Sequence, residues 1–219
     1  MEEEKPRSRE TLPHAGWVVP IAAVAVGITL AALVEARRRA RRRGAWRRSL
    51  RSPFRVDTVP GELLRIGVAP GLSILEVGCG AGAYLEEAAR TAGRGGEARG
   101  LEPDREQADL ARDRLRAQGL KVAIETAPVD RLPYADQEFD LAYLVGQMGR
   151  LRDHEAALGE VRRVLKPGGR LAVTEHFAEP GYVPASIVRR SCVAAGFEVA
   201  DSHDGPWDHT SAFRRPPLA

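Results

Sequence analysis

Residues 72–82 read Leu-Ser-Ile-Leu-Glu-Val-Gly-Cys-Gly-Ala-Gly, a short apolar run that stops at a cluster of glycines. The apolar run predicts a buried strand at 72–77, and the amphipathic stretch after the glycines predicts a helix at 83–91. Glycines at a strand-to-helix turn permit a tight turn and let the backbone come close to a ligand. The stretch therefore predicts a βα unit with a ligand-binding loop.

The same alternation of short apolar runs and amphipathic stretches continues along the chain from residue 56. Such alternation predicts βαβ units and a parallel sheet, so the expected fold class is α/β. The expected strands are 72–77, 97–102, 121–125, 139–145, 170–176, 197–201 and 210–214. The expected helices are 58–67, 83–91, 105–118, 153–165 and 184–195.

Two features of this unit fit more than one ligand. Residues 78–83 satisfy the G-x-G-x-x-A fingerprint of dinucleotide-binding proteins. Glu102 closes the second expected strand, 24 residues after Gly78, where a carboxylate can accept hydrogen bonds from both ribose hydroxyls. NAD and S-adenosylmethionine (SAM) would use these two features equally, so the choice depends on later motifs.

Three later motifs separate the two ligands: Leu-Pro-Tyr at 132–134, Phe-Asp at 139–140 and Leu-Lys-Pro-Gly-Gly at 165–169. In this order, the ensemble resembles the class I SAM-dependent methyltransferases. The similarity is greatest to their small-molecule branch, which includes the ubiquinone and menaquinone biosynthesis enzymes, and it covers about residues 56–216. It implies a Rossmann-like, seven-stranded, mostly parallel sheet of order 3-2-1-4-5-7-6 whose last strand is antiparallel, with SAM as the cofactor.

The resemblance also implies a role for each matching position. The amino-acid moiety of SAM is expected on the strand end and glycine loop, the ribose on the acidic residue, the adenine beside the residues that follow, and the methyl group near the end of strand four. In that order, the implied cofactor residues are Glu76, Gly78, Cys79, Gly80 and Gly82, then Glu102, then Pro103, Val129 and Asp130, and finally Val145.

One position departs from the family pattern. Relatives often carry Gly-Asp-Ala after strand three, and the Asp accepts a hydrogen bond from the adenine amino group. Here Pro128 stands in the Asp position. The adenine contact is therefore missing or comes from Asp130.

Two further residues are candidates for catalysis. Gln147 follows strand four, where it could bind SAM or orient a substrate. His176 ends strand five at the ligand-facing edge of the sheet, where it could act as a general base if the acceptor must lose a proton. The two cysteines, Cys79 and Cys192, lie in no metal-ligand cluster, and we expect no metal site.

The N-terminal part predicts a membrane anchor. Residues 17–34 are 18 consecutive residues without a charge, enough for a helix of about 27 Å. The positive-inside rule places the arginine-rich side in the cytoplasm. We therefore expect an extracytoplasmic tail at 1–16, a single transmembrane helix at 17–35, a juxtamembrane linker at 36–57 and a cytoplasmic methyltransferase domain at 58–219. A cleaved signal peptide, whose basic region would precede the apolar run, and a buried core helix are the alternatives.

The positive charge of the chain is concentrated in one block. The chain has a net charge of +3 and a pI of about 9.1, but ten arginines and no acidic residue lie between 37 and 55. Without those ten charges the net charge is −7, which disfavours a nucleic-acid partner for the rest of the chain. Arginines of the block are suited to anionic lipid headgroups instead.

The sequence leaves three functions open. The first is a membrane-anchored enzyme that methylates a small, lipophilic acceptor delivered from the bilayer. A non-catalytic SAM-binding protein is the second. The third, an NAD-dependent oxidoreductase, shares the glycine loop and Glu102 but leaves Leu-Lys-Pro-Gly-Gly unexplained. The sequence predicts no oligomeric state.

Overall fold

The computed structural model describes residues 58–217. The predicted tail at 1–16, transmembrane helix at 17–35 and linker at 36–57 lie outside the described residues, so these expectations stay predictions. Between residues 58 and 217, no helix combines the length and the apolar character needed to cross a bilayer.

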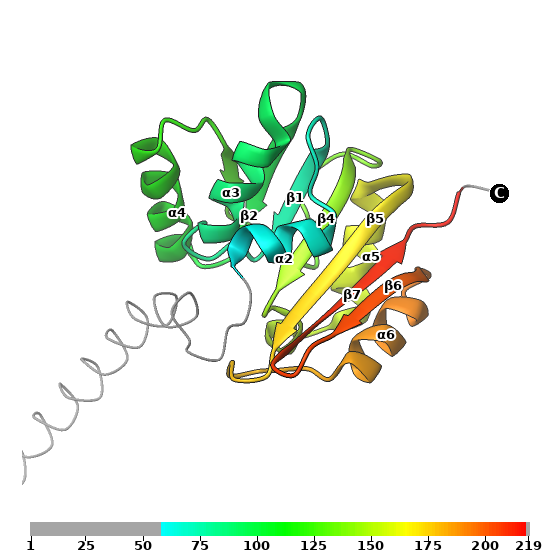
Figure 1. The fold of residues 1–219 in the computed structure, drawn as a ribbon. Coiled ribbons are helices and arrows are strands. Elements are labelled where there is room, and N and C mark those ends of the chain that lie inside the picture. The colour runs from blue at the N-terminus through cyan, green and yellow to red at the C-terminus, as the bar shows by residue number, and fades with distance from the viewer. Residues whose placement is uncertain (1–57, 218–219) are drawn as a thin grey trace, which may run out of the picture. The chain divides into compact units, whose positions relative to one another are not determined.

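A seven-stranded sheet forms the centre of the described part (Figure 1). Its strand order is β3-β2-β1-β4-β5-β7-β6, and β7 runs antiparallel to both of its neighbours. The predicted α/β class, strand order and antiparallel last strand are confirmed. The strands are β1 (Ser73–Val77), β2 (Glu97–Leu101), β3 (Ala123–Glu125), β4 (Phe139–Val145), β5 (Leu165–His176), β6 (Glu198–Asp204) and β7 (Asp208–Arg214).

Helices cover both faces of this sheet, as expected for parallel strands joined by crossovers. The helices are α2 (Val59–Ile66), α3 (Ala83–Ala92), α4 (Arg105–Ala117), α5 (His154–Val164) and α6 (Ala185–Ala194), and two 3₁₀ turns, η1 (Gly93–Gly95) and η2 (Met148–Arg150), lie between them. Alternate residues of the central strands point to opposite faces. Ile74 and Tyr143 pack with α2 and α3, whereas Leu75 and Leu144 pack with α5.

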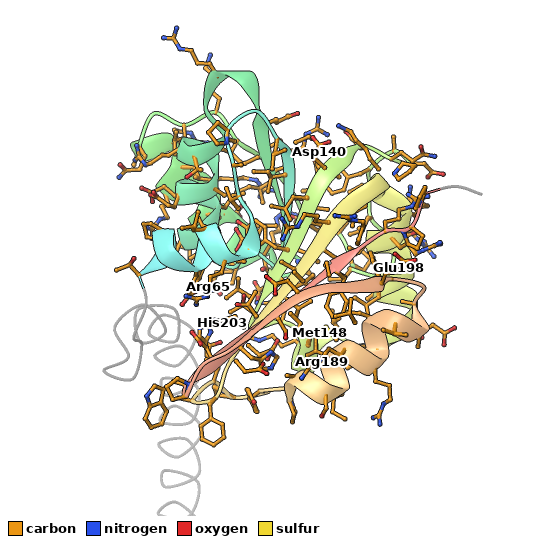
Figure 2. The ribbon with its side chains drawn as sticks, turned by 45° about the vertical axis from the view of Figure 1, so that its right-hand side comes forward. Arg65, Asp140, Met148, Arg189, Glu198 and His203 are labelled. Carbon is orange, nitrogen blue, oxygen red and sulfur yellow. The ribbon has the colours of Figure 1, made fainter. Side chains whose placement is uncertain are left out.

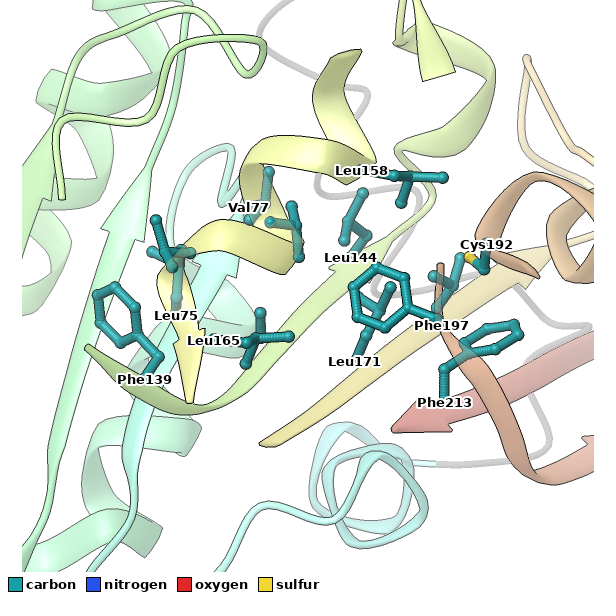
Figure 3. Packing of buried hydrophobic residues seen from close by; sticks show 14 of the residues in the cluster. Leu75, Val77, Phe139, Leu144, Leu158, Leu165, Leu171, Cys192, Phe197 and Phe213 are labelled. Atoms are coloured by element: carbon teal, nitrogen blue, oxygen red, sulfur yellow. The ribbon is translucent and has the colours of Figure 1, made fainter. Parts of the chain in front are cut away.

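The larger of the two main cores lies on the α5 and α6 side (Figure 3). It joins strand residues such as Leu171 and Phe213 to helix residues such as Leu158 and Cys192, all of them fully buried. A third cluster fastens α4 to β2 and β3 through Leu115 and its neighbours. Buried side chains therefore pack on both faces of the central strands. This packing holds in place the strand ends that carry the glycine loop.

The largest difference from the predicted strand boundaries is at β5. We predicted a helix up to residue 165 and a strand only from residue 170, but β5 already begins at Leu165. Leu165 pairs with Phe139, and Arg170 pairs with Leu141, so the register shifts between these pairs. Gly168, with a φ of +77°, supplies the left-handed backbone that this irregularity needs. The prediction was wrong because a strand that contains Pro and two glycines has the composition of a turn.

The Phe-Asp and Leu-Lys-Pro-Gly-Gly motifs meet at the amino ends of the strands. One carboxylate oxygen of Asp140 accepts a hydrogen bond from the Ser73 N–H at 2.9 Å, and the other lies 2.7 Å from the Lys166 Nζ. Figure 2 shows Asp140 at this end of the sheet and Met148 at the other. Partial burial raises the pKa of Asp140, but Lys166 and the Ser73 N–H more than offset it, so the pKa lies below its ordinary value. These two motifs therefore join β1, β4 and β5 and lie away from the glycine loop.

The Leu-Pro-Tyr motif has a similar structural role. The Tyr134 hydroxyl donates to the backbone oxygen of Gly100 at 3.0 Å. Arg163 of α5 donates to the backbone oxygens of Leu132 and Tyr134 at 3.0 and 2.9 Å. The motif therefore connects α5 with β2 and needs no ligand to explain it.

We predict that Asp140→Asn lowers the free energy of unfolding by about 1 kcal/mol at neutral pH, because the Lys166 ion pair is lost while the side chain keeps its shape. A carboxyl whose pKa is lowered by folding stabilises the protein above its unfolded pKa, and this contribution disappears as the pH falls through the lower, folded value. The difference from wild type should therefore shrink below about pH 4.

Urea denaturation at several pH values measures this difference. Asp109→Asn is the matched control, because Asp109 is 60% exposed and pairs only with Arg112 of the same helix at 2.8 Å. The control should shift stability by less than about 0.5 kcal/mol. Equal effects of the two substitutions would contradict the structural role of Asp140.

Candidate cofactor site

The glycine loop connects the end of β1 to the start of α3. Gly78, Gly80 and Gly82 have φ values of +76°, +52° and +76°. Side chains rarely adopt this left-handed backbone, which explains why every second residue of the loop is glycine. Gly82 also lies close to α4, since a Cβ added to it would be 3.0 Å from the Cβ of Ala111.

The amide groups of this loop bond to the protein itself. The N–H groups of Gly78 and Cys79 both donate to the backbone oxygen of Leu101, at 2.7 and 3.0 Å. The Gly80 N–H donates to Glu102 Oε2 at 2.7 Å. Three of the loop amides are therefore already bonded within the protein. The backbone is open at Gly80, where an added Cβ would have no atom within 4 Å, whereas the Gln147 side chain lies against Gly78 and Ala111 lies against Gly82.

Glu102 is oriented by two backbone amides. Its Oε2 accepts from Gly80, and its Oε1 accepts from the Asp104 N–H at 2.9 Å. The side chain follows β2 directly, and the residue is only 8% exposed. Each carboxylate oxygen has a second lone pair, so the group can still accept hydrogen bonds from a ligand.

A cavity of about 200 Å³ lies against this carboxylate and the first glycine of the loop. Its lining combines the ends of β1, β2 and β4 with the segments that follow, as is usual for a ligand site at the carboxyl edge of an open α/β sheet. The lining residues are Val77, Gly78, Glu102, Pro103, Val129, Gln147, Arg150 and Leu151.

Five of the predicted site residues therefore meet at one cavity: Gly78, Glu102, Pro103, Val129 and Gln147. The sequence prediction missed Arg150 and Leu151. Their position a few residues after the fourth strand was the only available signal, because neither residue type suggests a nucleoside ligand.

Two predicted residues lie beneath the loop. Glu76 is 3% exposed, and the Tyr143 hydroxyl donates to its Oε2 at 3.0 Å. Burial raises the pKa of Glu76 well above its ordinary value, with a lowering by the Tyr143 hydrogen bond and a further increase from Glu102. Cys79 is 5% exposed and its sulfur faces Gly100, while burial raises its thiol pKa. Cys79 is therefore a packing residue, and Glu76 supports the loop from below.

The remaining predicted residues line no part of this cavity. Asp130 is exposed and lies outside the lining, so the structure gives no support for its contact with adenine. Val145 is partly buried and packs against the core between the sheet and helices α2 and α3. Its backbone oxygen accepts from the Gln147 Nε2 at 3.3 Å.

Gln147 lies directly over the glycine loop. A Cβ added to Gly78 would lie 2.7 Å from the Cδ of Gln147. The Gln147 side chain therefore covers Gly78 and forms part of the cavity wall. A molecule bound across this loop would meet the Gln147 amide, and the role of Gln147 in binding or orientation stays a prediction.

His176 lies outside the lining of this cavity. It is 6% exposed; its Nε2 is 3.1 Å from Glu62 Oε1, and its Nδ1 is 3.5 Å from Glu179 Oε1. Sequence reasoning missed Glu62, although the glutamate shares the apolar face of its helix with Ile66, one turn later. Both ring nitrogens of His176 thus face protein carboxylates. A catalytic role for His176 therefore stays a prediction.

The comparison with known families agrees with this geometry. Residues 74–169 match the family described as "Methyltransferase domain", a range that holds the glycine loop, Glu102 and Leu-Lys-Pro-Gly-Gly. Residues 74–169, which are less than half of this chain, are therefore similar to a methyltransferase domain.

Individual relatives are similar to parts of this chain. The methyltransferase GfsG of Streptomyces halstedii is 38% identical over 113 residues, which are 51% of this chain and 40% of that protein. The ubiquinone/menaquinone biosynthesis C-methyltransferase UbiE of Bordetella avium (strain 197N) is 34% identical over 111 residues, 51% of this chain and 43% of that protein. The chain therefore spans less than half of the length of these curated relatives.

A solved structure shares the fold of the methyltransferase domain. The SAM-dependent methyltransferase of Aquifex aeolicus has a TM-score of 0.65 and 23% sequence identity over 72% of this chain and 89% of that chain. This likeness concerns the fold alone, and it covers more of the chain than the family match does.

SAM is the cofactor of the methyltransferase domain, and the residues at the cavity fit it. Glu102 offers acceptor oxygens suited to two ribose hydroxyls, and Pro103 and Val129 offer apolar surface for a purine ring. The open backbone at Gly80, where an added Cβ would have no atom within 4 Å, allows the amino-acid moiety to approach closely. The site would hold SAM by shape and by one oriented carboxylate.

We predict that Glu102→Gln raises the dissociation constant for SAM at least about tenfold. The amide replaces one acceptor oxygen by a donor, so one of the two bonds to Gly80 and Asp104 is lost together with a ribose contact; a hydrogen bond to a charged group contributes roughly 1.5–3 kcal/mol. Isothermal titration calorimetry measures the constant. Glu106→Gln, on the exposed first turn of α4, should leave it unchanged. Equal affinities of all three proteins would remove Glu102 from the site.

Proposed function

We propose that this chain is a membrane-anchored methyltransferase that moves the methyl group of SAM to a small, lipophilic acceptor. The observation that carries the proposal is the Glu102 carboxylate, oriented by the Gly80 and Asp104 amides against a cavity at the carboxyl edge of the sheet. The family match and the relatives named above support the reaction class.

Proximity and orientation account for the catalysis. SAM supplies an electrophilic methyl group on a sulfonium, which becomes a thioether on transfer. The chain holds the nucleoside through Glu102 and limits the approach to the loop through Gln147. Correct alignment of reactants alone can lower a barrier by about 7–11 kcal/mol. A general base is needed only if the acceptor must lose a proton, and His176 is the candidate for that role.

Exposed aromatic side chains support an apolar acceptor. Phe177 and Trp207 are 64% and 42% exposed, and the Phe177 N–H donates to the Trp207 backbone oxygen at 2.9 Å. The Phe177 ring also contacts that of Tyr182, with centroids 5.4 Å apart. These three residues lie just beyond the carboxyl end of β5 and beside the start of β7, the same edge of the sheet as the cofactor site. They offer an apolar surface to a lipophilic molecule.

The membrane part of the proposal is supported by the sequence alone. Residues 17–34 carry no charge and residues 37–55 carry ten arginines, a combination typical of a single-pass anchor with its basic side in the cytoplasm. Such an anchor would keep the methyltransferase domain at the bilayer surface, where apolar acceptors are concentrated.

Incubation of the full chain with methyl-labelled SAM and a membrane-lipid extract tests the reaction. We expect label in the organic phase, and its loss with the weakly binding Glu102→Gln protein. SAM binding without transfer to any component of lipid or aqueous extracts would favour a non-catalytic SAM-binding protein. Affinity for NAD in place of SAM would favour an oxidoreductase.

Deletion of residues 1–35 tests the anchor. We predict that the shortened protein moves from the membrane to the soluble fraction and keeps its SAM affinity, while turnover of a vesicle-borne acceptor falls at least tenfold because the acceptor is no longer encountered at the surface. Calorimetry with SAM is the control for folding. Undiminished turnover of the vesicle-borne acceptor would remove membrane delivery from the proposal.

A further inference from the structure

Three side chains from distant parts of the chain converge beside the end of β5. They are Glu62 of α2, His176 of β5 and Asp208 of β7, and one potential ligand atom from each lies within 4.8 Å of the others. Their convergence has a backbone basis, because His176 and Asp208 are opposite each other in the antiparallel register of β5 and β7. We propose that these three residues bind a divalent transition-metal ion.

The distances suit a metal ion after the ligands move closer together. Metal bonds to imidazole nitrogen and carboxylate oxygen are about 2.0–2.2 Å long, so neighbouring ligands of a tetrahedral ion are about 3.3–3.6 Å apart. The three ligand atoms lie within 4.8 Å of one another, so the longest separation would shorten by up to about 1.5 Å. Glu62 Oε1 and His176 Nε2 are already 3.1 Å apart, a normal separation for adjacent ligands.

Carboxylates gather around the imidazole of this cluster. Those of Glu62, Asp208 and Glu179 lie beside His176, and the Arg65 guanidinium lies 3.3 Å from Asp208. Glu62 is fully buried, and the side chains of His176 and Asp208 are 8% and 14% exposed.

The ligand types narrow the choice of metal. Imidazole with carboxylates suits zinc, manganese, iron or cobalt, whereas magnesium and calcium prefer oxygen ligands alone. The Tyr84 hydroxyl donates to the second oxygen of Glu62 and so orients this ligand from outside. We therefore expect a first-row divalent transition metal, with Glu179 close enough to His176 to supply a further oxygen.

Arg65 competes with the metal for Asp208. Its guanidinium contacts Asp208 Oδ2 at 3.3 Å and repels a divalent ion nearby. If the cluster is a metal site, Arg65→Gln should therefore strengthen metal binding. If the cluster is only a structural ion-pair network, the same substitution should weaken folding and create no metal affinity. Arg65 thus gives a test whose sign differs between the two cases.

Cobalt(II) is the probe, because its visible absorption reports nitrogen and oxygen ligation. Full-length, tag-free protein in detergent is stripped with EDTA and titrated with cobalt, followed by zinc in competition. We expect one saturable equivalent. His176→Gln and Asp208→Asn should each raise the dissociation constant at least about tenfold, and Arg65→Gln should lower it.

The matched control is the double variant His203→Gln/Asp204→Asn, which removes an imidazole and a carboxylate from the exposed edge strand β6. Its cobalt affinity should equal that of the wild type. Circular dichroism and thermal unfolding of the metal-free proteins check folding, and the partly exposed Asp208 position decides the outcome if His176→Gln does not fold. Absence of a saturable cobalt site, or equal affinity in wild type and Asp208→Asn, would overturn the proposal.

Discussion

The bond between the Glu102 carboxylate and the Gly80 amide is the interaction on which the cofactor site depends. It fixes the glycine loop after β1 to the end of β2, while Leu101 binds two further amides of the same loop. A carboxylate that already accepts from two backbone amides cannot rotate freely, so its remaining lone pairs point in defined directions. The site is organised before any ligand arrives, which limits the entropy lost on binding.

The family motifs divide into two physical groups at opposite ends of the strands. Asp140 and Lys166 form an ion pair at the amino ends, and Tyr134 closes a hydrogen bond to β2, so these motifs stabilise the sheet. Only the glycine loop and Glu102 face the cavity. At the carboxyl ends, Glu175 accepts hydrogen bonds from the Met148 and Val183 amides and so holds together the segments after β4 and β5.

Periodicity predicted most of the fold, because buried parallel strands are nearly continuous apolar runs and helices show an apolar face. The strand order came from the family resemblance. Composition failed at 165–169, where Pro and two glycines lie inside a strand. The residues around the site were predicted in part. The spacing of Gly78 and Glu102 in the sequence indicated that they lie together, whereas the positions of Arg150 and Glu62 depend on how distant elements pack. The membrane anchor at 17–35 lies outside the described residues and stays a prediction.

The proposed metal cluster and the cofactor site share helix α3. Its first turn follows the glycine loop and carries Tyr84, whose hydroxyl binds the same Glu62 that contacts His176. A metal on Glu62 would draw electron density from this carboxylate and change its bond to Tyr84, two residues after Gly82. Because the glycine loop leads directly into this helix, a shift of α3 on binding at one place would alter the other. Metal and SAM affinities should then depend on each other by the same factor, and Tyr84 is the contact through which that dependence would pass.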